Sequence, residues 1–437
     1  MSAFSILFVM SLFSFALHNL KILKRLSILV FGISFGLTLN HYQIPLMGFE
    51  TSSSVELFEM VLFVVLGATV LSLDEHIAIT QTLFLATASV LILESFTLVS
   101  FVISFEALSI ISFVLVSYMK NDKEASGAIG MFISGSFATA IIMLGVAFYL
   151  LDGHSLTQKI SVNVDGFGML GLWIVLVGLF YKLTIVPMHS WALDSYAKVR
   201  PAYAGILSGI VKTVVFLATF KMFAPFIDAN FAISSSILVT LALITMTLGN
   251  FLAIFTKKVE QILSYSSIAH AGYMLLAFVS VKSSYAQSGL LYMAIAYIFM
   301  QTSVFLLLDK LSNGKGNLYL EDLKGLAQKD KLSALFLTIQ LFSLAGIPLL
   351  AGFMGKAVLV YAVVDANFIF VALFTLLNSA LSVGYYAWIV KHFYFDTKNN
   401  EEKVVTVSKP IYVSQTIFLV GTLYFGMFAF NVFGFSF

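Results

Sequence analysis

The segment Leu176–Trp191, LVGLFYKLTIVPMHSW, places one lysine in a continuous apolar run and a proline five residues later. If this run crosses a bilayer, a charged side chain near its centre costs about 2.5–3.5 kcal/mol on insertion scales. Pro187 lacks the backbone N–H of a helical residue and therefore breaks or kinks the helix that carries Lys182. The segment predicts a broken helix with an ionisable group at its centre.

The whole chain has the composition of a membrane protein. Its 437 residues are 60% hydrophobic and 11% charged, with a mean hydropathy of +0.99, whereas about a quarter of the residues in a soluble domain are charged. Apolar runs near twenty residues recur throughout, and each can cross the hydrocarbon core as a helix. Because these runs are continuous and not alternating, they favour helices over a barrel. We predict an all-α polytopic membrane protein.

Hydropathy and turn residues predict about fourteen spans. They lie near residues 2–19, 27–46, 57–73, 76–95, 96–119, 125–151, 166–193, 203–225, 234–255, 260–280, 284–308, 332–364, 366–390 and 411–434. The boundary near Ser95 leaves almost no linker between two helices. Of the 24 lysines and arginines, 18 fall in loops on one side, 2 in loops on the other side and 4 within spans. This bias satisfies the positive-inside rule and places both termini on the outer side.

The residue types give no indication of a bound cofactor, metal or nucleic acid in this chain. The chain has no cysteine, which excludes disulfides and thiolate-ligated iron–sulfur clusters. The charged segment between residues 309 and 331 carries no nucleotide or metal motif and is predicted to be a cytoplasmic loop.

Four charged residues lie deep within predicted spans and need a reason to be there. They are Glu106, Lys182, Lys212 and Lys356. Lys221 is different, because it lies four residues before Pro225, where its stem can reach the outer interface. We interpret Lys221 as structural. Any one of the central lysines could also reach an interface, but this explanation does not suit all four charges together.

The span around Lys356 is too long for one straight helix. Residues 332–364 would extend about 50 Å, well beyond a hydrocarbon core of about 30 Å. The sequence LAGIPLLAGFMGK supplies the helix breakers Gly346, Pro348 and Gly352. Two interrupted helices, each with a lysine and five spans apart, indicate two related halves whose breaks mark a transport pathway.

Buried lysines and a glutamate suit proton transfer. Burial disfavours the charged form of each group, whereas an opposite charge nearby favours it. The interaction is worth about 4 kcal/mol at 4 Å with an effective dielectric constant near 20. A lysine whose partner is screened or withdrawn can therefore release a proton. A sugar or peptide carrier would instead need a roomy site with hydrogen-bonding groups.

Three stretches together resemble a known family. They are YKLTIVPMHSWALDSY at 181–196, ILSYSSIAHAGYMLLAF at 262–278 and LFSLAGIPLLAGFMGK at 341–356. The chain closely resembles the antiporter-like membrane subunits of respiratory complex I, and among them the subunit N branch of NADH-quinone oxidoreductase. The resemblance covers nearly the whole chain. It implies inverted five-helix repeats formed by helices 4–8 and 9–13, with helices 7 and 12 broken.

The resemblance also implies domain boundaries. Helices 1–3 would occupy residues 1–75, the first repeat 76–225, the second repeat 226–394, and the last loop and helix 395–437. The stretch KVRPAYAG at 198–205 departs from the family's usual glycine-alanine-proline turn.

The four buried charges acquire roles from the resemblance. Glu106 resembles the helix 5 glutamate that pairs with the helix 7 lysine, here Lys182. Lys212 resembles the helix 8 lysine that links two half-channels, and Lys356 the helix 12 residue of the outer half-channel. Subunit M and a multi-subunit Na⁺/H⁺ antiporter protein have glutamate at this last position. Subunit L has lysine there but carries an additional lateral helix.

Several other polar residues are weaker candidates. His270 resembles a family histidine and would relay protons between Lys212 and Lys356, or serve as a hydrogen-bonded packing residue. His189 resembles a residue that caps or lines the inner entrance. Other polar residues would order water or, more often, form interhelical bonds; they are Tyr265, Gln301, Gln340, Asn250 and Asn378.

Three functions are considered, and the first is the prediction, because Lys356 argues against the second and the full set of four buried charges argues against the third. The first is a proton-translocating membrane-arm subunit of complex I in a bacterial inner membrane, part of a translocase but without redox chemistry of its own. NADH, FMN, iron–sulfur clusters and quinone would then belong to the whole complex, and the partners would be sister subunits and lipid. The second is a subunit of a multi-subunit cation/proton antiporter. The third is a structural subunit that moves no protons.

Overall fold

The computed structural model describes residues 3–17, 19–40, 49, 52–118, 122–162, 164–395 and 407–428. Parts of the predicted spans lie outside the described residues, namely residues 2, 18, 41–46, 119 and 429–434. Most of the predicted loop after residue 395 lies outside them as well.

The chain forms two compact units. Unit 1 comprises Met1–Thr184 and Val211–Phe231, and unit 2 comprises Ile185–Ile210 and Ala232–Phe437. The units follow contacts within the fold and do not test the predicted repeat boundaries, which stay a prediction. Each unit is described below by itself.

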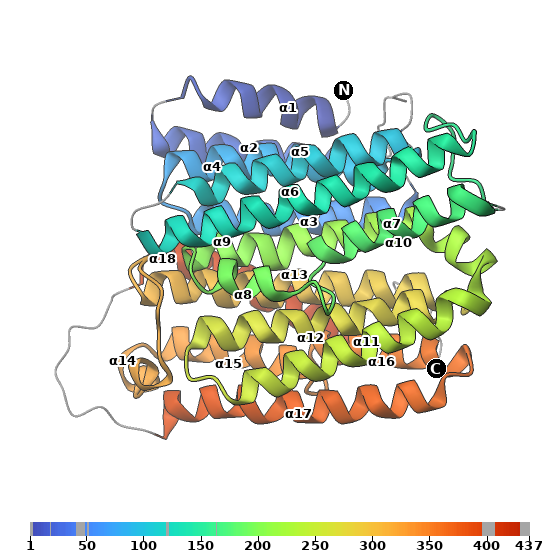
Figure 1. Ribbon diagram of the computed structural model, residues 1–437. Coiled ribbons are helices and arrows are strands. Elements are labelled where there is room, and N and C mark those ends of the chain that lie inside the picture. The colour runs from blue at the N-terminus through green and yellow to red at the C-terminus, as the bar shows by residue number, and fades with distance from the viewer. Residues whose placement is uncertain are drawn as a thin grey trace. The chain divides into compact units, whose positions relative to one another are not determined.

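Unit 1 is built from long antiparallel helices (Figure 1). Within it, α2 packs on α3, α4 on α5 and α6 on α7, so helices that follow one another in sequence are neighbours. Its helices are α1 (Ala3–Ser14), α2 (Leu20–Leu39), α3 (Ser53–Ser72), α4 (His76–Glu94), α5 (Leu98–Ser117), α6 (Asp122–Leu151), α7 (Gly166–Lys182) and α10 (Lys212–Ala229).

The sharp turn near Ser95 confirms the predicted boundary with almost no linker. The backbone N–H of Ser95 donates to the Leu91 carbonyl at 3.0 Å. Two residues later a capping box begins α5, because the Thr97 hydroxyl accepts from the Ser100 N–H and the Ser100 hydroxyl accepts from the Thr97 N–H. Such a reciprocal cap satisfies N–H groups that would otherwise lack partners at the start of a helix.

Close packing of α6 and α7 fixes the helix that carries Lys182. A Cβ atom on Gly145 would lie 2.5 Å from the Gly171 carbonyl oxygen, and one on Gly171 would lie 2.5 Å from the Gly145 carbonyl oxygen. Small residues at a helix interface allow two backbones to approach closely in a membrane protein. Any side chain at either position would push α7 away from α6.

Unit 2 has the most buried helices of the described chain at its centre. The apolar stretch of α13 (Ala286–Leu311) is completely buried, and the apolar stretch of α12 (Val259–Val279) is almost completely buried. The other elements are α8 (Ser190–Tyr196), α9 (Pro201–Gly205), η1 (Ile206–Val211), α11 (Phe231–Ile254), η2 (Leu320–Leu323), α14 (Leu326–Lys329), α15 (Lys331–Ala345), α16 (Ala351–Asp365), α17 (Ile369–Tyr394) and α18 (Lys409–Met427).

The helices match the fourteen predicted spans. Among the described residues, 11 helices are long and apolar enough to cross a membrane, and three shorter apolar helices are Ala3–Ser14, Gly166–Lys182 and Lys331–Ala345. The last two continue after a break as α8 and α16. The all-α polytopic fold is confirmed, and so are the breaks within 166–193 and 332–364.

Several predicted boundaries are wrong by a few residues. The first helix ends at Ser14 and not near residue 19, the second ends at Leu39 and not near residue 46, and the third begins at Ser53 and not near residue 57. The second helix begins at Leu20 and not near residue 27, because the Asn19 side chain accepts from the N–H groups of Lys21 and Ile22 and caps the helix. The eighth span continues to Ala229 and does not end at Pro225.

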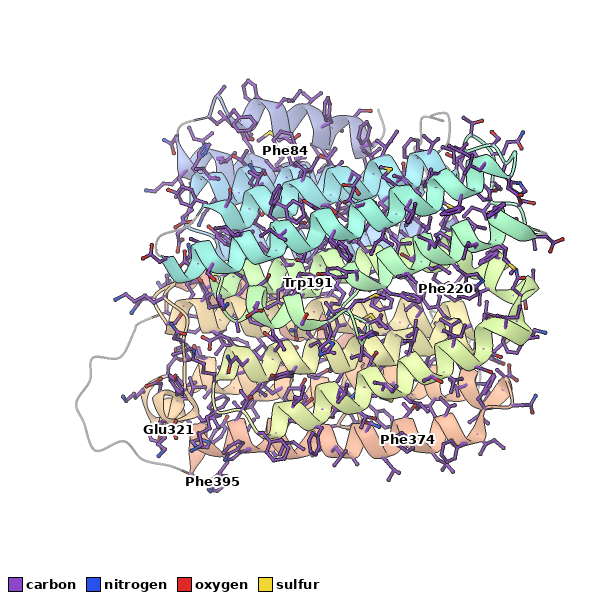
Figure 2. All side chains as sticks on the ribbon, in the orientation of Figure 1. Phe84, Trp191, Phe220, Glu321, Phe374 and Phe395 are labelled. Carbon is purple, nitrogen blue, oxygen red and sulfur yellow. The ribbon has the colours of Figure 1, made fainter. Side chains whose placement is uncertain are left out.

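Large apolar side chains cover outward faces of the helices. On α17, the Phe370 side chain is 69% exposed and that of Leu377 is 63% exposed. Figure 2 labels two phenylalanines of this region: Phe374 lies on α17, and Phe395 is the residue that follows its last turn. Exposed apolar surface on this scale belongs against lipid or a partner protein.

Candidate functional site

The predicted break at Pro187 begins earlier than the proline itself. α7 ends at Lys182, and Thr184 adopts a left-handed backbone conformation with φ of 63°. The Thr184 N–H donates to the Tyr181 carbonyl at 3.1 Å. A proline ring clashes with the carbonyl four residues before it, which for Pro187 is that of Leu183. The proline therefore ends the helix about one turn upstream and leaves Lys182 as its last residue.

Lys182 is buried at this helix end. Its side chain is 7% exposed, and its Nζ atom has no hydrogen-bond partner among the described residues. The ammonium lies 4.9 Å from the centroid of the Phe113 ring. The ring face and the carbonyl end of α7 both attract a positive charge. These contacts favour the cation without fixing its three donors.

Glu106 is the counter-charge of Lys182 but does not bond to it. The two groups interact electrostatically. The Glu106 carboxylate accepts from the Thr139 hydroxyl, at 2.9 Å to Oε1 and 3.1 Å to Oε2. Thr139 thus holds the carboxylate in place, and the pairing of Glu106 with Lys182 stays a prediction. Sequence reasoning missed Thr139, because a hydroxyl in a predicted span is usually bonded to its own helix.

Lys212 meets the same break. It is the first residue of α10, directly after the π-helical turn η1, and its side chain is 2% exposed. Its Nζ donates to the Thr184 hydroxyl at 2.8 Å. In unit 1 both lysines therefore meet at the left-handed residue Thr184. Lys182 lies two residues before it in sequence, and Lys212 is hydrogen-bonded to its side chain. Short π segments occur often at functional positions in helices.

The second break lies wholly in unit 2, where sequence reasoning placed it. α15 ends at Ala345, and Gly346 has φ of 89°. Its N–H donates to the carbonyls of Phe342 and Ser343, and the Ile347 N–H also donates to Phe342. This is the glycine cap that commonly ends a helix. Pro348 lies in the break, and α16 resumes at Ala351.

Lys356 closes the end of α15. Its Nζ donates to the carbonyls of Leu344 and Ala345 at 2.9 and 3.0 Å, and to the Ser379 hydroxyl at 3.2 Å. An ammonium group has three donors, so these three acceptors satisfy it. A Cβ atom on Gly346 would lie 3.3 Å from this Nζ. Gly346 therefore provides both the left-handed cap and the space for the lysine.

A pocket of about 500 Å³ adjoins Lys356. It lies between α16 and α17, and its lining is largely apolar. The polar groups at its edge include Lys356 and Ser379, and the Tyr361 side chain at its rim is 50% exposed. The lysine thus borders a space large enough for several water molecules.

A buried polar network follows from Lys356 through unit 2. Its ammonium lies 4.9 Å from the ring centroid of Tyr273. The Asn250 amide donates to the Tyr273 hydroxyl at 3.0 Å and to the Asn378 carbonyl at 3.0 Å, and Asn250 Oδ1 accepts from Tyr385 at 3.1 Å. Asn250 and Asn378 therefore form interhelical bonds, the more common role for such residues.

The two histidine candidates have different surroundings. His270 is fully buried on α12, where its Nδ1 donates to the Ser266 carbonyl at 2.9 Å and its ring stacks on Tyr297 at 4.9 Å. His189 is half-buried and precedes α8, and it forms no side-chain cap there. A relay role for His270 and an entrance-lining role for His189 stay predictions.

Two glutamines also bridge helices. Gln301 donates to the Ser208 hydroxyl at 3.3 Å, and Gln340 accepts from the Thr422 hydroxyl at 2.9 Å. Within the described parts of the chain, no group of three or more His, Asp or Glu side chains is placed to hold a metal ion.

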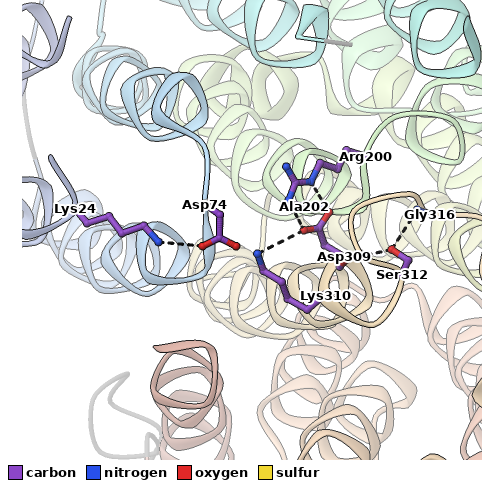
Figure 3. Close-up of polar contacts among 8 residues, drawn as sticks. All are labelled: Lys24, Asp74, Arg200, Ala202, Asp309, Lys310, Ser312 and Gly316. Atoms are coloured by element: carbon purple, nitrogen blue, oxygen red, sulfur yellow. Dashed lines mark hydrogen bonds and ion pairs between the residues drawn. The ribbon is translucent and has the colours of Figure 1, made fainter. Parts of the chain in front are cut away.

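The unusual stretch KVRPAYAG is held by a buried ion pair (Figure 3). Arg200 donates from Nε and Nη2 to the two carboxylate oxygens of Asp309 at 2.7 and 2.8 Å. The Ala202 N–H also donates to Asp309, at 3.4 Å, and Pro201 occupies the first position of α9. A two-point arginine–carboxylate contact fixes geometry as well as charge. Figure 3 also shows the exposed Lys24–Asp74 ion pair of unit 1, at 3.3 Å.

Comparison with known proteins agrees with these features. Residues 95–382 match the family described as NADH:quinone oxidoreductase/Mrp antiporter, transmembrane. The chain is 30% identical over 386 residues to NADH-quinone oxidoreductase subunit N of Trichlorobacter lovleyi, covering 84% of this chain and 79% of the relative. It is also 30% identical over 364 residues to F(420)H(2) dehydrogenase subunit N of Methanosarcina mazei, covering 80% and 74%.

A solved structure shows the same fold. A chain of respiratory complex I from Thermus thermophilus superimposes with a TM-score of 0.84 over 97% of each chain, at 24% sequence identity. The family match covers more than half of the sequence, and the helices are long and apolar. The chain is therefore an integral membrane protein that belongs to the NADH:quinone oxidoreductase/Mrp antiporter transmembrane family.

Proposed function

We propose that this chain is a proton-translocating subunit in the membrane arm of a respiratory NADH:quinone oxidoreductase. The observation that carries the proposal is the pairing of each helix break with buried lysines. Lys182 and Lys212 lie at the end of α7, and Lys356 closes the end of α15. Relatives named subunit N, matched over most of their length, support the assignment to this kind of complex.

The geometry of unit 1 suits a lysine that changes its protonation state. Burial away from water opposes the charged form of Lys182, whereas the field of Glu106 supports it. With no hydrogen-bond partner in the described chain, the ammonium depends on Glu106 and the Phe113 ring. A change in the charge or distance of Glu106 would therefore shift Lys182 between holding and releasing a proton.

The geometry of unit 2 suits a lysine that receives a proton. Two backbone carbonyls and the Ser379 hydroxyl accept from Lys356, so its charged form is solvated by the protein. The adjoining pocket leaves open space beside the same amine. We propose that protons enter from the cytoplasmic side past the Pro187 turn, pass Lys182 and Lys212, and leave near Lys356.

The redox cofactors of such a complex would lie in other subunits. Relatives of this chain carry the names of an NADH-quinone oxidoreductase and of an F(420)H(2) dehydrogenase, so one subunit type serves enzymes named for different electron donors. NADH, FMN, iron–sulfur clusters and quinone would belong to the assembly. We place the chain in a bacterial inner membrane with both termini outside, on the basis of the positive-inside rule.

Purification of a tagged copy from native membranes in mild detergent tests this proposal. We expect iron–sulfur subunits and quinone reductase activity to copurify with the chain. The alternative, a subunit of a multi-subunit cation/proton antiporter, has the support of the family description. Recovery with other antiporter subunits, no iron–sulfur protein and sodium-dependent transport would contradict the first assignment and support this second one.

A further inference from the structure

Unit 1 contains a second group of charged residues, whose electrostatic partners are not the relay candidates. Glu59 of α3 interacts electrostatically with Glu94 of α4, Lys221 of α10 and Glu56 of α3. The electrostatic partner of Lys182 is instead Glu106. We call Glu56, Glu59, Glu94 and Lys221 the outer carboxyl cluster. The positive-inside rule predicts that the α3–α4 loop, which contains Asp74, is cytoplasmic. The start of α3 and the end of α4 are at the opposite ends of these helices and so belong to the outer side.

Glu59 is the most enclosed member of the cluster. Its side chain is 2% exposed, and its Oε1 atom is buried without a hydrogen-bond partner in the described chain. A carboxylate oxygen that is buried without a hydrogen-bond donor loses its hydration and has no direct replacement for it. A proton on this oxygen would remove the charge and so most of the penalty.

The charges of the cluster do not balance. It contains three carboxyl groups and one amine, so full ionisation would leave two excess negative charges in a mostly buried site. Two neighbouring carboxylates in low dielectric disfavour each other's ionised form. The other charged groups on α4 and α10 are Lys212, which donates to Thr184, Asp228, which is exposed, and Glu75 and His76 at the far end of α4. The neighbouring helices α2 and α5 carry Lys21, Lys24, Arg25 and Glu106. None of these groups is an electrostatic partner of Glu59 or Glu94, so they do not restore the balance.

Lys221 lies beside Glu94 within the cluster. Its Nζ donates to the Leu93 carbonyl at 2.8 Å, next to Glu94. Both Lys221 and Glu94 are half-buried. Glu94 therefore gives the cluster contact with the surface, while Glu59 lies inside.

We propose that Glu59 and Glu94 together hold one exchangeable proton, with Lys221 as their counter-charge. The outer carboxyl cluster is then a proton-binding site of unit 1 in addition to the groups at the α7 break. The proton moves between Glu94, which faces the surface, and Glu59, which is closed off from it. The site stands on the local geometry and charge, independently of the proposed pumping route.

Carbodiimide labelling of the intact complex in native membranes tests the site. Dicyclohexylcarbodiimide adds to protonated carboxyl groups in apolar surroundings and leaves a stable N-acylurea that mass spectrometry locates. We expect an adduct on Glu59 or Glu94 that disappears as the pH rises. Lys221→Met should move the loss of labelling to higher pH by about one unit or more, because a nearby cation favours the ionised carboxylate. Glu94→Gln should move the labelling of Glu59 to lower pH.

A control and a second readout complete the experiment. Glu75→Gln, at the other end of α4, should leave the labelling unchanged. Infrared spectra of the purified complex should contain a protonated carboxyl band that fades as the pH rises. The band should fade at lower pH in Glu94→Gln and be missing in the double variant Glu59→Gln/Glu94→Gln. The proposal is overturned by the absence of both adduct and band, or by labelling that ignores Lys221→Met and Glu94→Gln. It is equally overturned if sodium ions alone protect the carboxyls, which would mark a cation site. None of these readouts measures pumping, so they fail or succeed separately from the proposed function.

Discussion

Each of the two broken helices has a first half that ends near a lysine. In unit 1 this half is α7, which ends at Lys182, and in unit 2 it is α15, which ends at Ala345. In each case a residue with positive φ follows, Thr184 or Gly346. The lysines differ. Lys356 has three acceptors for its three donors, whereas Lys182 has none among the described residues and relies on Glu106 at a distance.

This difference assigns different work to the two breaks. In unit 2 the protein backbone itself stabilises the charged lysine, and that support is permanent. In unit 1 the support comes from a carboxylate on another helix, which can be strengthened or weakened by protonation or movement. We infer that unit 1 contains the controllable step and unit 2 the receiving step.

The largest effect is expected from Lys356→Met. This change removes the charged donor to the last two α15 carbonyls, so it should lower quinone reductase activity and proton uptake by at least about tenfold, equivalent to about 1.4 kcal/mol. Measurements in inverted membrane vesicles check it. Lys282→Met, a lysine of a predicted outer loop, is the matched control and should keep both activities. Full activity in Lys356→Met would show that unit 2 needs no cation at its break.

A smaller but clear loss is expected from Glu106→Ala. Without its counter-charge, Lys182 should lose its proton more readily, and proton pumping should fall several-fold while the complex still assembles. Glu106→Asp should keep much of the activity, because it retains the charge. If both variants assemble and pump like the parent, the electrostatic pair is structural and the contrast between the units disappears.

Gly346→Ala tests the backbone side of the comparison. A side chain at φ of 89° is strained, at a cost of about 1–2 kcal/mol, and its Cβ would lie 3.2 Å from Lys356 Cδ. We expect a lower temperature of thermal inactivation. Gly384→Ala on α17, where a Cβ would meet no atom within 4 Å, should be neutral or slightly stabilising. Equal inactivation temperatures of the two variants would contradict the proposal that Gly346 provides both the helix cap and the space for Lys356.

The smallest effect is expected from Ser379→Ala. It removes one of three acceptors and leaves two carbonyls on Lys356. A net contribution of about 1 kcal/mol for one hydrogen bond predicts a change in turnover of less than about fivefold. Thr139→Val makes the corresponding change in unit 1 and should affect pumping more, because Glu106 has no second hydrogen-bond donor in the described residues. The reverse order would contradict the account.

The sequence predicted the breaks better than their chemistry. Pro187, Gly346 and Pro348 are local signals with fixed backbone consequences, so the two interruptions could be predicted from span length and residue type. The acceptors of Lys356 are backbone carbonyls of α15, which no pattern of side chains reveals. The Thr139 hydroxyl contacts both the Gly135 carbonyl of its own helix and the Glu106 carboxylate, and only packing decides whether a threonine meets a glutamate.

The outer carboxyl cluster illustrates a second limit. Glu59 and Glu94 lie near the ends of predicted spans, where an acidic residue is expected to face water. Only the packing of α3 and α10 on α4 buries Glu59 beside Glu94 and Lys221. The positions of charges along a span therefore predict burial well at the centre and poorly at the ends.

The most direct test of the account is the proton-to-electron stoichiometry of Lys182→Arg in membrane vesicles. Arginine keeps the positive charge and fills the site but stays protonated in proteins, so it cannot release a proton. We expect Lys182→Arg to lower quinone reductase activity and proton uptake about as strongly as the neutral Lys182→Met. A structural lysine would behave otherwise, with arginine restoring function and only methionine doing harm. Normal stoichiometry and activity in Lys182→Arg would contradict the proposal that Lys182 exchanges a proton at the end of α7.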